Sequence, residues 1–197
     1  MVYKAAIIGC HGVGKTTLIK KLSDKFMVFG EVAINSFMGN DSFLSEIKII
    51  VDNILLNKKI AETKADSISD RFAFLDALIY SEGFYKMGWI NYEQLKIIYS
   101  IVNNSKHTWV YPEKIIIMND SKELIIKNIL KRGRSKNLNE ADDKFLTVML
   151  QLFNDFYTGH LNFQYLKPEI HDRIKKIPKY EIKCYEDIRY VLEILNK

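Results

Sequence analysis

The hydrophobic residues of the chain fall into short apolar runs and longer segments with apolar residues at helical spacing. The short runs predict strands at 2–8, 28–34, 65–69, 114–118 and 180–185. Helical spacing and capping residues predict helices at 15–25, 42–57, 71–85, 91–102, 121–131, 141–157 and 187–196. Strands that alternate with helices of this length need crossover connections, so we expect an α/β fold with a mostly parallel sheet covered by helices on both faces.

The carboxyl ends of the strands are where ligands bind in a sheet of this kind. Four segments far apart in the sequence are predicted to lie at that edge: the turn after residue 8, Glu31, the pair Asp70-Arg71 and the pair Met118-Asn119. We therefore expect these four segments to meet at one cleft.

The turn after the first strand carries the most specific motif of the chain. Gly9, Gly14, Lys15 and Thr16 match the pattern G-x-x-x-x-G-K-[ST], and the match lies between a predicted strand and a predicted helix, where this pattern binds phosphate. Glycines let consecutive backbone N–H groups close around an anion, and the start of the next helix adds positive potential. The alternative is a chance glycine turn, and the strand and helix on either side argue against it.

We expect this turn to bind the triphosphate of ATP through main-chain amides. In that role Lys15 reaches the β- and γ-phosphates, and the Thr16 hydroxyl ligates Mg²⁺. His11 is expected to face solvent, and Cys10 to be a small residue without a nucleophilic role. The predicted nucleotide-binding residues are Gly9, His11, Gly12, Val13, Gly14, Lys15, Thr16 and Thr17.

Asp70 and Arg71 follow the third predicted strand, beside the phosphate-binding turn. In a functional interpretation, Asp70 holds Mg²⁺ directly or through water, and Arg71 binds a phosphate or an acceptor hydroxyl. In a structural interpretation, Asp70 is the N-cap of the next helix and Arg71 faces solvent. The position of the pair beside the turn favours the functional interpretation.

Glu31 lies in the otherwise apolar run 28–34. A carboxylate at this edge of the sheet could accept the proton of an attacking hydroxyl as a general base. A solvated edge position explains the residue equally well. Asp41 and Asp76 are weaker candidates for the same neighbourhood.

Arg132 and Arg134 flank a glycine at the end of a predicted helix, at the start of the longest polar stretch of the chain. Two arginines beside a glycine hinge favour a lid at about 131–144 that places positive charge on the transferring phosphoryl group. The alternative is a cationic helix end that complements the helix dipole. The phosphate-binding turn elsewhere in the chain favours the lid.

Composition limits the classes of protein to which the chain can belong. With 197 residues, 48% of them hydrophobic, it can bury a substantial core, and we expect one domain over 1–197. A net charge of +5 without arginine-rich tracts gives little support to nucleic-acid binding. No apolar run approaches the length of a membrane span, and the first strand leaves no room for a signal sequence, so a cytoplasmic protein is expected.

The turn at 9–17, the Asp70-Arg71 pair and the Arg132-Gly133-Arg134 segment make the chain resemble the P-loop nucleoside and nucleotide kinases, in particular deoxyribonucleoside and thymidylate kinases. The resemblance follows the order of the motifs over most of the chain. It implies a parallel five-stranded sheet, an arginine-bearing lid, and a catalytic glutamate on the second strand that Glu31 matches. It also implies that Arg71 positions the acceptor and that Arg132 and Arg134 bind the donor phosphates.

We therefore predict an ATP- and Mg²⁺-dependent kinase that transfers the γ-phosphoryl group to a nucleoside or nucleoside monophosphate. The segments 69–80 and 31–33 also resemble a broader group that includes nicotinamide riboside kinases, which leaves the acceptor open. A nucleotide-dependent regulatory ATPase and a non-catalytic nucleotide-binding module are further alternatives, and the lack of an N-K-x-D motif argues against a GTPase. Homodimers are common in the kinases that the chain resembles, so a homodimer is an expected assembly.

Overall fold

The computed structural model describes residues 2–32, 41–132, 142–183 and 188–197. These residues form a five-stranded sheet in which every neighbouring pair of strands is parallel, in the order β2-β3-β1-β4-β5. The strands are β1 (Tyr3–Ile8), β2 (Met27–Phe29), β3 (Ser67–Asp70), β4 (Lys114–Met118) and β5 (Lys179–Ile182). The expected parallel five-stranded sheet is confirmed.

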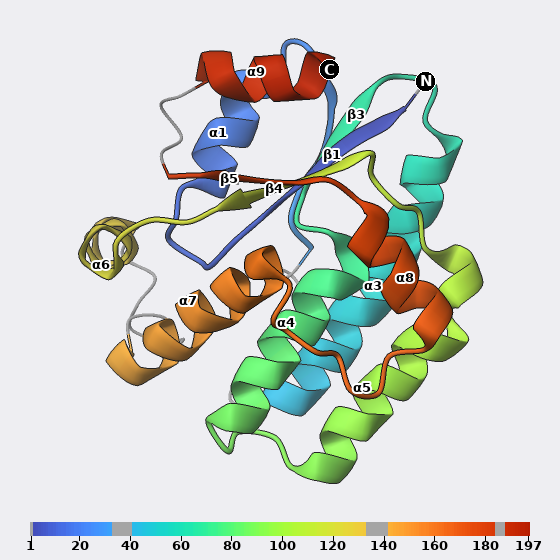
Figure 1. Cartoon of the computed structure of the whole chain (residues 1–197), viewed down its shortest axis with the longest axis vertical. Helices are drawn as coiled ribbons and strands as arrows, with labels where there is room; N and C mark the ends of the chain where they lie inside the picture. The colour runs from blue at the N-terminus through green and yellow to red at the C-terminus, as the bar shows by residue number, and fades with distance from the viewer. Residues whose placement is uncertain (1, 33–40, 133–141, 184–187) are drawn as a thin grey trace.

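Helices cover both faces of this sheet. They are α1 (Lys15–Leu22), α3 (Ser42–Glu62), α4 (Ala73–Lys86), α5 (Tyr92–Asn104), α6 (Lys122–Arg132), α7 (Asp143–Thr158), α8 (Pro168–Lys176) and α9 (Ile188–Asn196), with one short 3₁₀ turn, η1 (Lys106–Thr108). Figure 1 shows α1 and α9 on one side of the sheet and α3, α4 and α7 on the other. Within the described part of the chain, no helix combines the length and the apolar character that crossing a membrane requires.

Several predicted elements have other bounds in the structure; α3, for example, ends at Glu62 and not at residue 57. β2 ends at Phe29, so Glu31 lies in the connection after the strand and not within it. α4 begins at Ala73 and not at residue 71, because Asp70 is the last residue of β3 and Arg71 has a left-handed backbone, with φ 83°. α8 was not predicted, although a proline at its first position and isoleucines four residues apart are signals for a helix.

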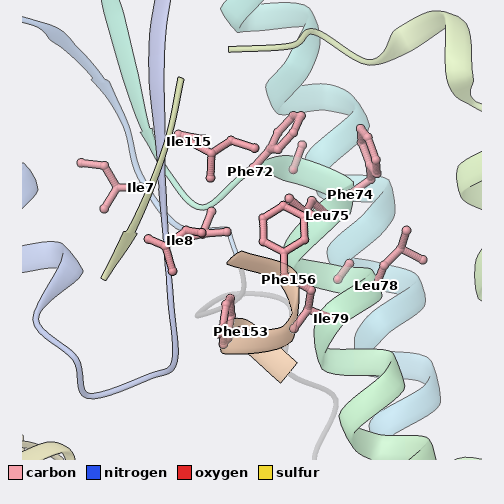
Figure 2. Close-up of a cluster of buried hydrophobic side chains, with 14 of the residues drawn as sticks. Ile7, Ile8, Phe72, Phe74, Leu75, Leu78, Ile79, Ile115, Phe153 and Phe156 are labelled. Carbon is pink, nitrogen blue, oxygen red and sulfur yellow. The ribbon is translucent and has the colours of Figure 1, made fainter. Parts of the chain in front are cut away.

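The main core lies between the sheet and helices α4 and α7. Figure 2 shows isoleucines of β1 and β4 in one cluster with side chains that precede or belong to α4 and α7; the labelled residues are Ile7, Ile8, Phe72, Phe74, Leu75, Leu78, Ile79, Ile115, Phe153 and Phe156. α4 is buried along most of its length, as expected for a helix that is apolar on nearly all sides. The core therefore fixes the position of any polar side chain that α4 carries.

The order of the strands creates one edge at which a ligand site is expected. β1 lies between β3 and β4, so the chain crosses from one side of β1 to the other, and the crevice at the carboxyl ends of the strands opens there. Ile7 near the end of β1 is paired with Asp70 at the end of β3. This register puts the glycine-rich turn after β1 directly beside the Asp70-Arg71 pair.

Candidate active site

The turn between β1 and α1 approaches its neighbours so closely that it has no room for side chains at two glycines. Gly9 has φ 142°, and a Cβ there would lie 2.3 Å from the carbonyl oxygen of Met118. Gly12 has φ 81°, and a Cβ there would lie 2.7 Å from the side chain of Ile129 on α6. Asn128 of α6 also donates a hydrogen bond to the carbonyl oxygen of Gly12, at 2.9 Å. The turn is therefore held against both β4 and α6.

The start of α1 is suited to an anion. Its N-cap is Gly14, with φ 104°, and no side chain caps it. The first N–H groups of a helix have no partner within the helix, and they attract negative charge when no side chain satisfies them. The structure thus gives this turn the features of a phosphate-binding loop.

Lys15 points back over the turn instead of into solvent. Its ammonium donates hydrogen bonds to the carbonyl oxygens of Gly9 and Cys10, at 2.8 and 2.9 Å, and the residue is 5% exposed. Burial lowers the pKa of Lys15, the nearby Arg71 guanidinium lowers it further, and the Asp70 carboxyl group opposes both effects. A cationic group therefore lies inside the turn, at the end of β1.

Thr16 and Asp70 form the contact between this turn and β3. The Thr16 hydroxyl donates to Oδ2 of Asp70 at 3.2 Å, and the buried Oδ1 finds no hydrogen-bond partner among the described residues. Burial raises the pKa of Asp70 even though Lys15 and Arg71 lower it. A hydroxyl and a carboxylate with a spare oxygen are ligands of the kind that Mg²⁺ takes together with water and phosphate oxygens, so the two residues fit that ion. No group of three or more His, Cys, Asp or Glu side chains that could hold a metal occurs in the described ranges.

Arg71 is the centre of a largely buried ion-pair network. Its Nε and Nη2 atoms each lie 2.6 Å from Oε1 of Glu31, and Nη1 lies 3.4 Å from Oδ1 of Asp76. The other oxygen of Asp76 accepts the backbone N–H of Phe72 at 2.7 Å, at the start of α4. The guanidinium lies 4.9 Å from the centre of the Tyr80 ring. Arg71, which directly follows β3, thus links the connection after β2 to α4.

These contacts rule out the structural interpretations of the charged residues. Asp70 belongs to β3, and the N-cap of α4 is Phe72, so Asp70 does not cap the helix. The side chains of Arg71 and Glu31 are only 14% and 17% exposed, so neither is a solvated edge residue. Asp76, a weaker candidate in the sequence, contacts Arg71, whereas Asp41 caps α3 through the N–H of Leu44.

The charges of the network keep Glu31 ionised. Burial raises the pKa of Glu31, but the charges of Arg71 and Lys15 outweigh burial, and the net pKa is lowered. Asp76 lies deeper, and burial raises its pKa to about 6 against the effect of Arg71. Burial lowers the pKa of Arg71, but Glu31 and other negative groups leave it well above its ordinary value, so the guanidinium stays charged.

The expectation that His11 faces solvent is wrong. Its backbone N–H donates to the hydroxyl of Tyr80 at 3.1 Å. Its ring stacks on Phe145 of α7, with ring centres 5.5 Å apart and ring planes at 15°. Tyr80 in turn lies against Arg71, so the turn is packed against both α4 and α7.

The four segments that were expected to converge do so in part. The turn after β1, Glu31 and the Asp70-Arg71 pair are in contact, and the Met118 carbonyl borders Gly9. Asn119 instead bonds to β5, through its N–H to the carbonyl oxygen of Ile182 and through its side chain to Glu181, each at 2.9 Å. Arg132 is the last residue of α6, and Arg134 and positions 133–141 of the expected lid lie outside the described residues.

Glu46, which was not a candidate from the sequence, is buried on α3. The residue is 3% exposed, and its Oε2 atom finds no hydrogen-bond partner in the described ranges. Burial raises the pKa of Glu46 to about 8, although the charge of Arg71 lowers it. Glu46 is thus a mostly protonated acid close to the ionised Glu31–Arg71 pair.

Glu46→Gln should make the protein more stable at high pH. Unfolding returns the pKa of Glu46 from about 8 to its ordinary 4.5, so the wild type loses stability as pH rises through that interval. Glutamine keeps the shape without the titration. The free energy of unfolding of the variant should match that of the wild type near pH 4.5 and exceed it by on the order of 4 kcal/mol at pH 9.

Urea unfolding at pH 4.5, 7 and 9 measures this difference. Glu62→Gln is the matched control, since Glu62 is on the same helix with a side chain 66% exposed. If both variants follow the pH dependence of the wild type, Glu46 is not held protonated.

Comparison with known proteins gives one kind of match. No protein-family model matches the chain, and no curated protein sequence matches it either. Solved structures do match over almost the whole length. Three of them are structures of deoxyadenosine kinase from M. mycoides. The structure with the products dCMP and a flexible dCDP bound has 19% sequence identity and a TM-score of 0.77, and the match covers 98% of both chains. The structure with bound dATP has 18% identity, a TM-score of 0.76 and coverage of 98% of this chain and 99% of that one, and the structure with bound dCTP has 18% identity, a TM-score of 0.74 and coverage of 98% of both chains.

Sequence identities of 18–19% with TM-scores of 0.74–0.77 show a shared fold. Deoxyadenosine kinases are P-loop nucleoside kinases. The chain therefore has the fold of the P-loop nucleoside kinases, the group that its motifs resemble.

Proposed function

We propose that the protein is an ATP- and Mg²⁺-dependent phosphotransferase that moves the γ-phosphoryl group of ATP to a hydroxyl or monophosphate of a nucleoside-like acceptor. The observation that carries the proposal is that two sets of groups lie side by side: the turn with Lys15, Thr16 and Asp70, and the Arg71–Glu31 pair, whose charges act on Lys15. The first set suits a triphosphate, and the second suits a hydroxyl that must lose its proton. The fold shared with deoxyadenosine kinase supports a nucleoside-like acceptor.

The turn and Lys15 would bind the donor. The glycines and the uncapped start of α1 offer main-chain N–H groups to the phosphates, and the Lys15 ammonium would exchange the carbonyl oxygens of Gly9 and Cys10 for the β- and γ-phosphates. Negative charge on the transferring oxygens grows during the reaction, so a fixed ammonium lowers the barrier. Arg132 and Arg134 would add positive charge from the expected lid.

Thr16 and Asp70 would hold Mg²⁺ through the hydroxyl and the spare Oδ1 atom. When bound, this ion neutralises charge on the β- and γ-phosphates. The contact between Thr16 and Asp70 keeps both side chains at the end of β3, where the phosphates of a nucleotide in the turn would lie.

Arg71 and Glu31 would bind the acceptor. Oε1 of Glu31 accepts the Nε–H hydrogen bond of Arg71 and also pairs with Nη2, so Oε2 would take the proton of an acceptor hydroxyl held next to the guanidinium. The lowered pKa of Glu31 makes it a weak base. A weak base suffices where the transition state is loose and positioning supplies most of the rate enhancement.

Release of ADP that depends on an acceptor tests the proposal. With Mg²⁺ and ATP present, at least one member of a panel of nucleosides, nucleoside monophosphates and nicotinamide riboside should raise ADP release by orders of magnitude above the acceptor-free rate. Mass spectrometry of that reaction should find the phosphorylated acceptor, and chelation of Mg²⁺ should abolish both signals.

The same screen separates the alternatives. ADP release that no acceptor stimulates would indicate a regulatory ATPase. Nucleotide binding without ADP release would indicate a non-catalytic nucleotide-binding module. Either result contradicts the phosphotransferase proposal.

A further inference from the structure

Asp70 and Arg71 are neighbours in the sequence, yet both side chains belong to the same candidate site. Consecutive side chains of an extended strand point to opposite faces of the sheet. Here Asp70 meets Thr16 while Arg71 meets Glu31, and the two charges are close enough to shift each other's pKa. The backbone must therefore leave the extended conformation between them.

The backbone of Arg71 makes this change. Its φ of 83° is left-handed, a conformation that costs free energy for any residue with a side chain and persists only where the surroundings hold it. The N–H of Arg71 continues the sheet and donates to the carbonyl oxygen of Ile7 on β1, at 2.8 Å. The carbonyl of Arg71 turns back and accepts the hydroxyl of Ser69, at 2.6 Å. Both polar backbone groups of the strained residue are thus bound.

Ser69 is itself oriented by Tyr3. The single hydroxyl hydrogen of Ser69 goes to the Arg71 carbonyl, so the Tyr3 hydroxyl, which contacts Oγ of Ser69, must donate in that contact. Ser69 is 1% exposed and Tyr3 9%, so water does not compete for these bonds. Burial raises the pKa of Tyr3, which keeps the donor proton on its hydroxyl. A buried chain of hydrogen bonds therefore runs from β1 through β3 to the Arg71 carbonyl.

We propose that Ser69, oriented by Tyr3, is a positioning residue that holds Arg71 in its left-handed conformation and thereby aims the guanidinium at the acceptor. The inference rests on the proposed function only in naming the acceptor as the ligand of the guanidinium. The effect of Ser69 on the Arg71 side chain follows from the backbone alone. Without the Ser69 hydroxyl, the carbonyl loses its partner, and the side chain of Arg71 is free to leave Glu31.

β3 offers a matched control for this proposal. Ser67 lies two residues before Ser69 in the same strand and is fully buried, and its hydroxyl has no hydrogen-bond partner among the described residues. Ser69→Ala and Ser67→Ala therefore make the same chemical change in the same strand. Only the first removes a bond to the Arg71 carbonyl.

The first measurement is kinetic, with the acceptor found in the ADP screen. Ser69→Ala should lower kcat/KM for the acceptor on the order of tenfold, with KM for ATP within about twofold of the wild type. Ser67→Ala should leave both values unchanged. Tyr3→Phe keeps the hydroxyl of Ser69 but removes the donor that orients it, so it should lower kcat/KM for the acceptor by a smaller factor. If Ser69→Ala fails to fold, Tyr3→Phe tests the role of Ser69 in its place.

The second measurement does not depend on activity. Arginine Nε–H signals are observed by ¹⁵N NMR, and comparison with Arg71→Lys assigns the signal of Arg71. The bond to Glu31 protects this hydrogen in the wild type, and Ser69→Ala should speed its exchange by at least about tenfold, while Ser67→Ala should not.

The two measurements separate failure of the inference from failure of the proposed function. If the wild type phosphorylates no acceptor, the proposed function fails, and the exchange rates still decide whether Ser69 holds Arg71. If Ser69→Ala and Tyr3→Phe both keep the wild-type exchange rate and acceptor kinetics, Ser69 is not a positioning residue. Equal losses in Ser67→Ala and Ser69→Ala would also overturn the inference, because they would reflect a general weakening of β3.

Discussion

Lys15→Ala should lower kcat by about 10²- to 10³-fold while the fold remains intact. The ammonium is the cationic group enclosed by the turn, and in the proposed reaction it stabilises the charge that develops on the transferring phosphoryl group. The fold should survive because the two bonds that Lys15 makes in the structure go to carbonyls of the turn itself. Initial rates of ADP release with the acceptor measure the effect, and circular dichroism checks the fold.

Lys20→Ala is the matched control, since Lys20 is an exposed lysine in the last turn of the same helix. It should keep wild-type kinetics. Calorimetry with Mg²⁺ and ATP should show weaker nucleotide binding for Lys15→Ala alone. An alanine variant at position 15 that keeps most of the acceptor-dependent activity would falsify the role given to Lys15.

The donor half of the candidate site was predictable because its determinants are contiguous. The conformations of Gly9 and Gly12, the glycine cap of α1 and the lysine that follows it all lie within one short segment. Such a segment folds in nearly the same way wherever a strand precedes it and a helix follows it. The conformation of the turn therefore follows from its spacing, whereas the surroundings of His11 were misjudged. The nucleotide-binding role of the residues of the turn stays a prediction.

The acceptor half depends on packing between distant segments, which leaves a weaker trace in the sequence. Glu31 reaches Arg71 across 40 positions of the chain. From the expected fold, only the presence of both residues at one edge of the sheet was predicted, and not the bond between them. The left-handed backbone of Arg71 has no sequence signal, because the conformation usually requires glycine. The contribution of Ser69 therefore became visible only in the structure.

α3 shows that hydrophobic spacing predicted the helix but not its buried face. Leu44, Val51 and Leu55 are 47%, 48% and 59% exposed, whereas Glu46 and Asn53 are buried on another face. Asn53 donates to the carbonyl oxygen of Ala73, at 3.2 Å, so a polar side chain is satisfied at the contact with α4. The burial of Asn53 and Glu46 depends on the packing of α3 against the rest of the protein, which the apolar spacing of the helix does not encode, so Glu46 was missed.

Arg71→Lys should impair use of the acceptor and leave binding of the nucleotide nearly unchanged. Lysine keeps the positive charge, so Glu31 and Asp76 do not become unpaired buried carboxylates and the protein should fold. Lysine cannot reproduce the planar fork that puts Nε and Nη2 on one oxygen of Glu31 and Nη1 on Asp76. We expect kcat/KM for the acceptor to fall by about 10²-fold, with the dissociation constant for Mg²⁺ and ATP nearly unchanged.

Steady-state kinetics with varied acceptor, together with calorimetry of nucleotide binding, distinguish this result from a general loss of activity. Arg173→Lys on α8 is the control, because Arg173 is exposed and lies over Tyr111, which precedes the amino end of β4, whereas the candidate site is at the carboxyl ends of the strands. If Arg71→Lys weakens nucleotide binding as much as acceptor use, Arg71 belongs to the donor half. The Arg71 guanidinium would then neutralise phosphate charge instead of orienting a hydroxyl, and the acceptor would have to bind through other residues of the site.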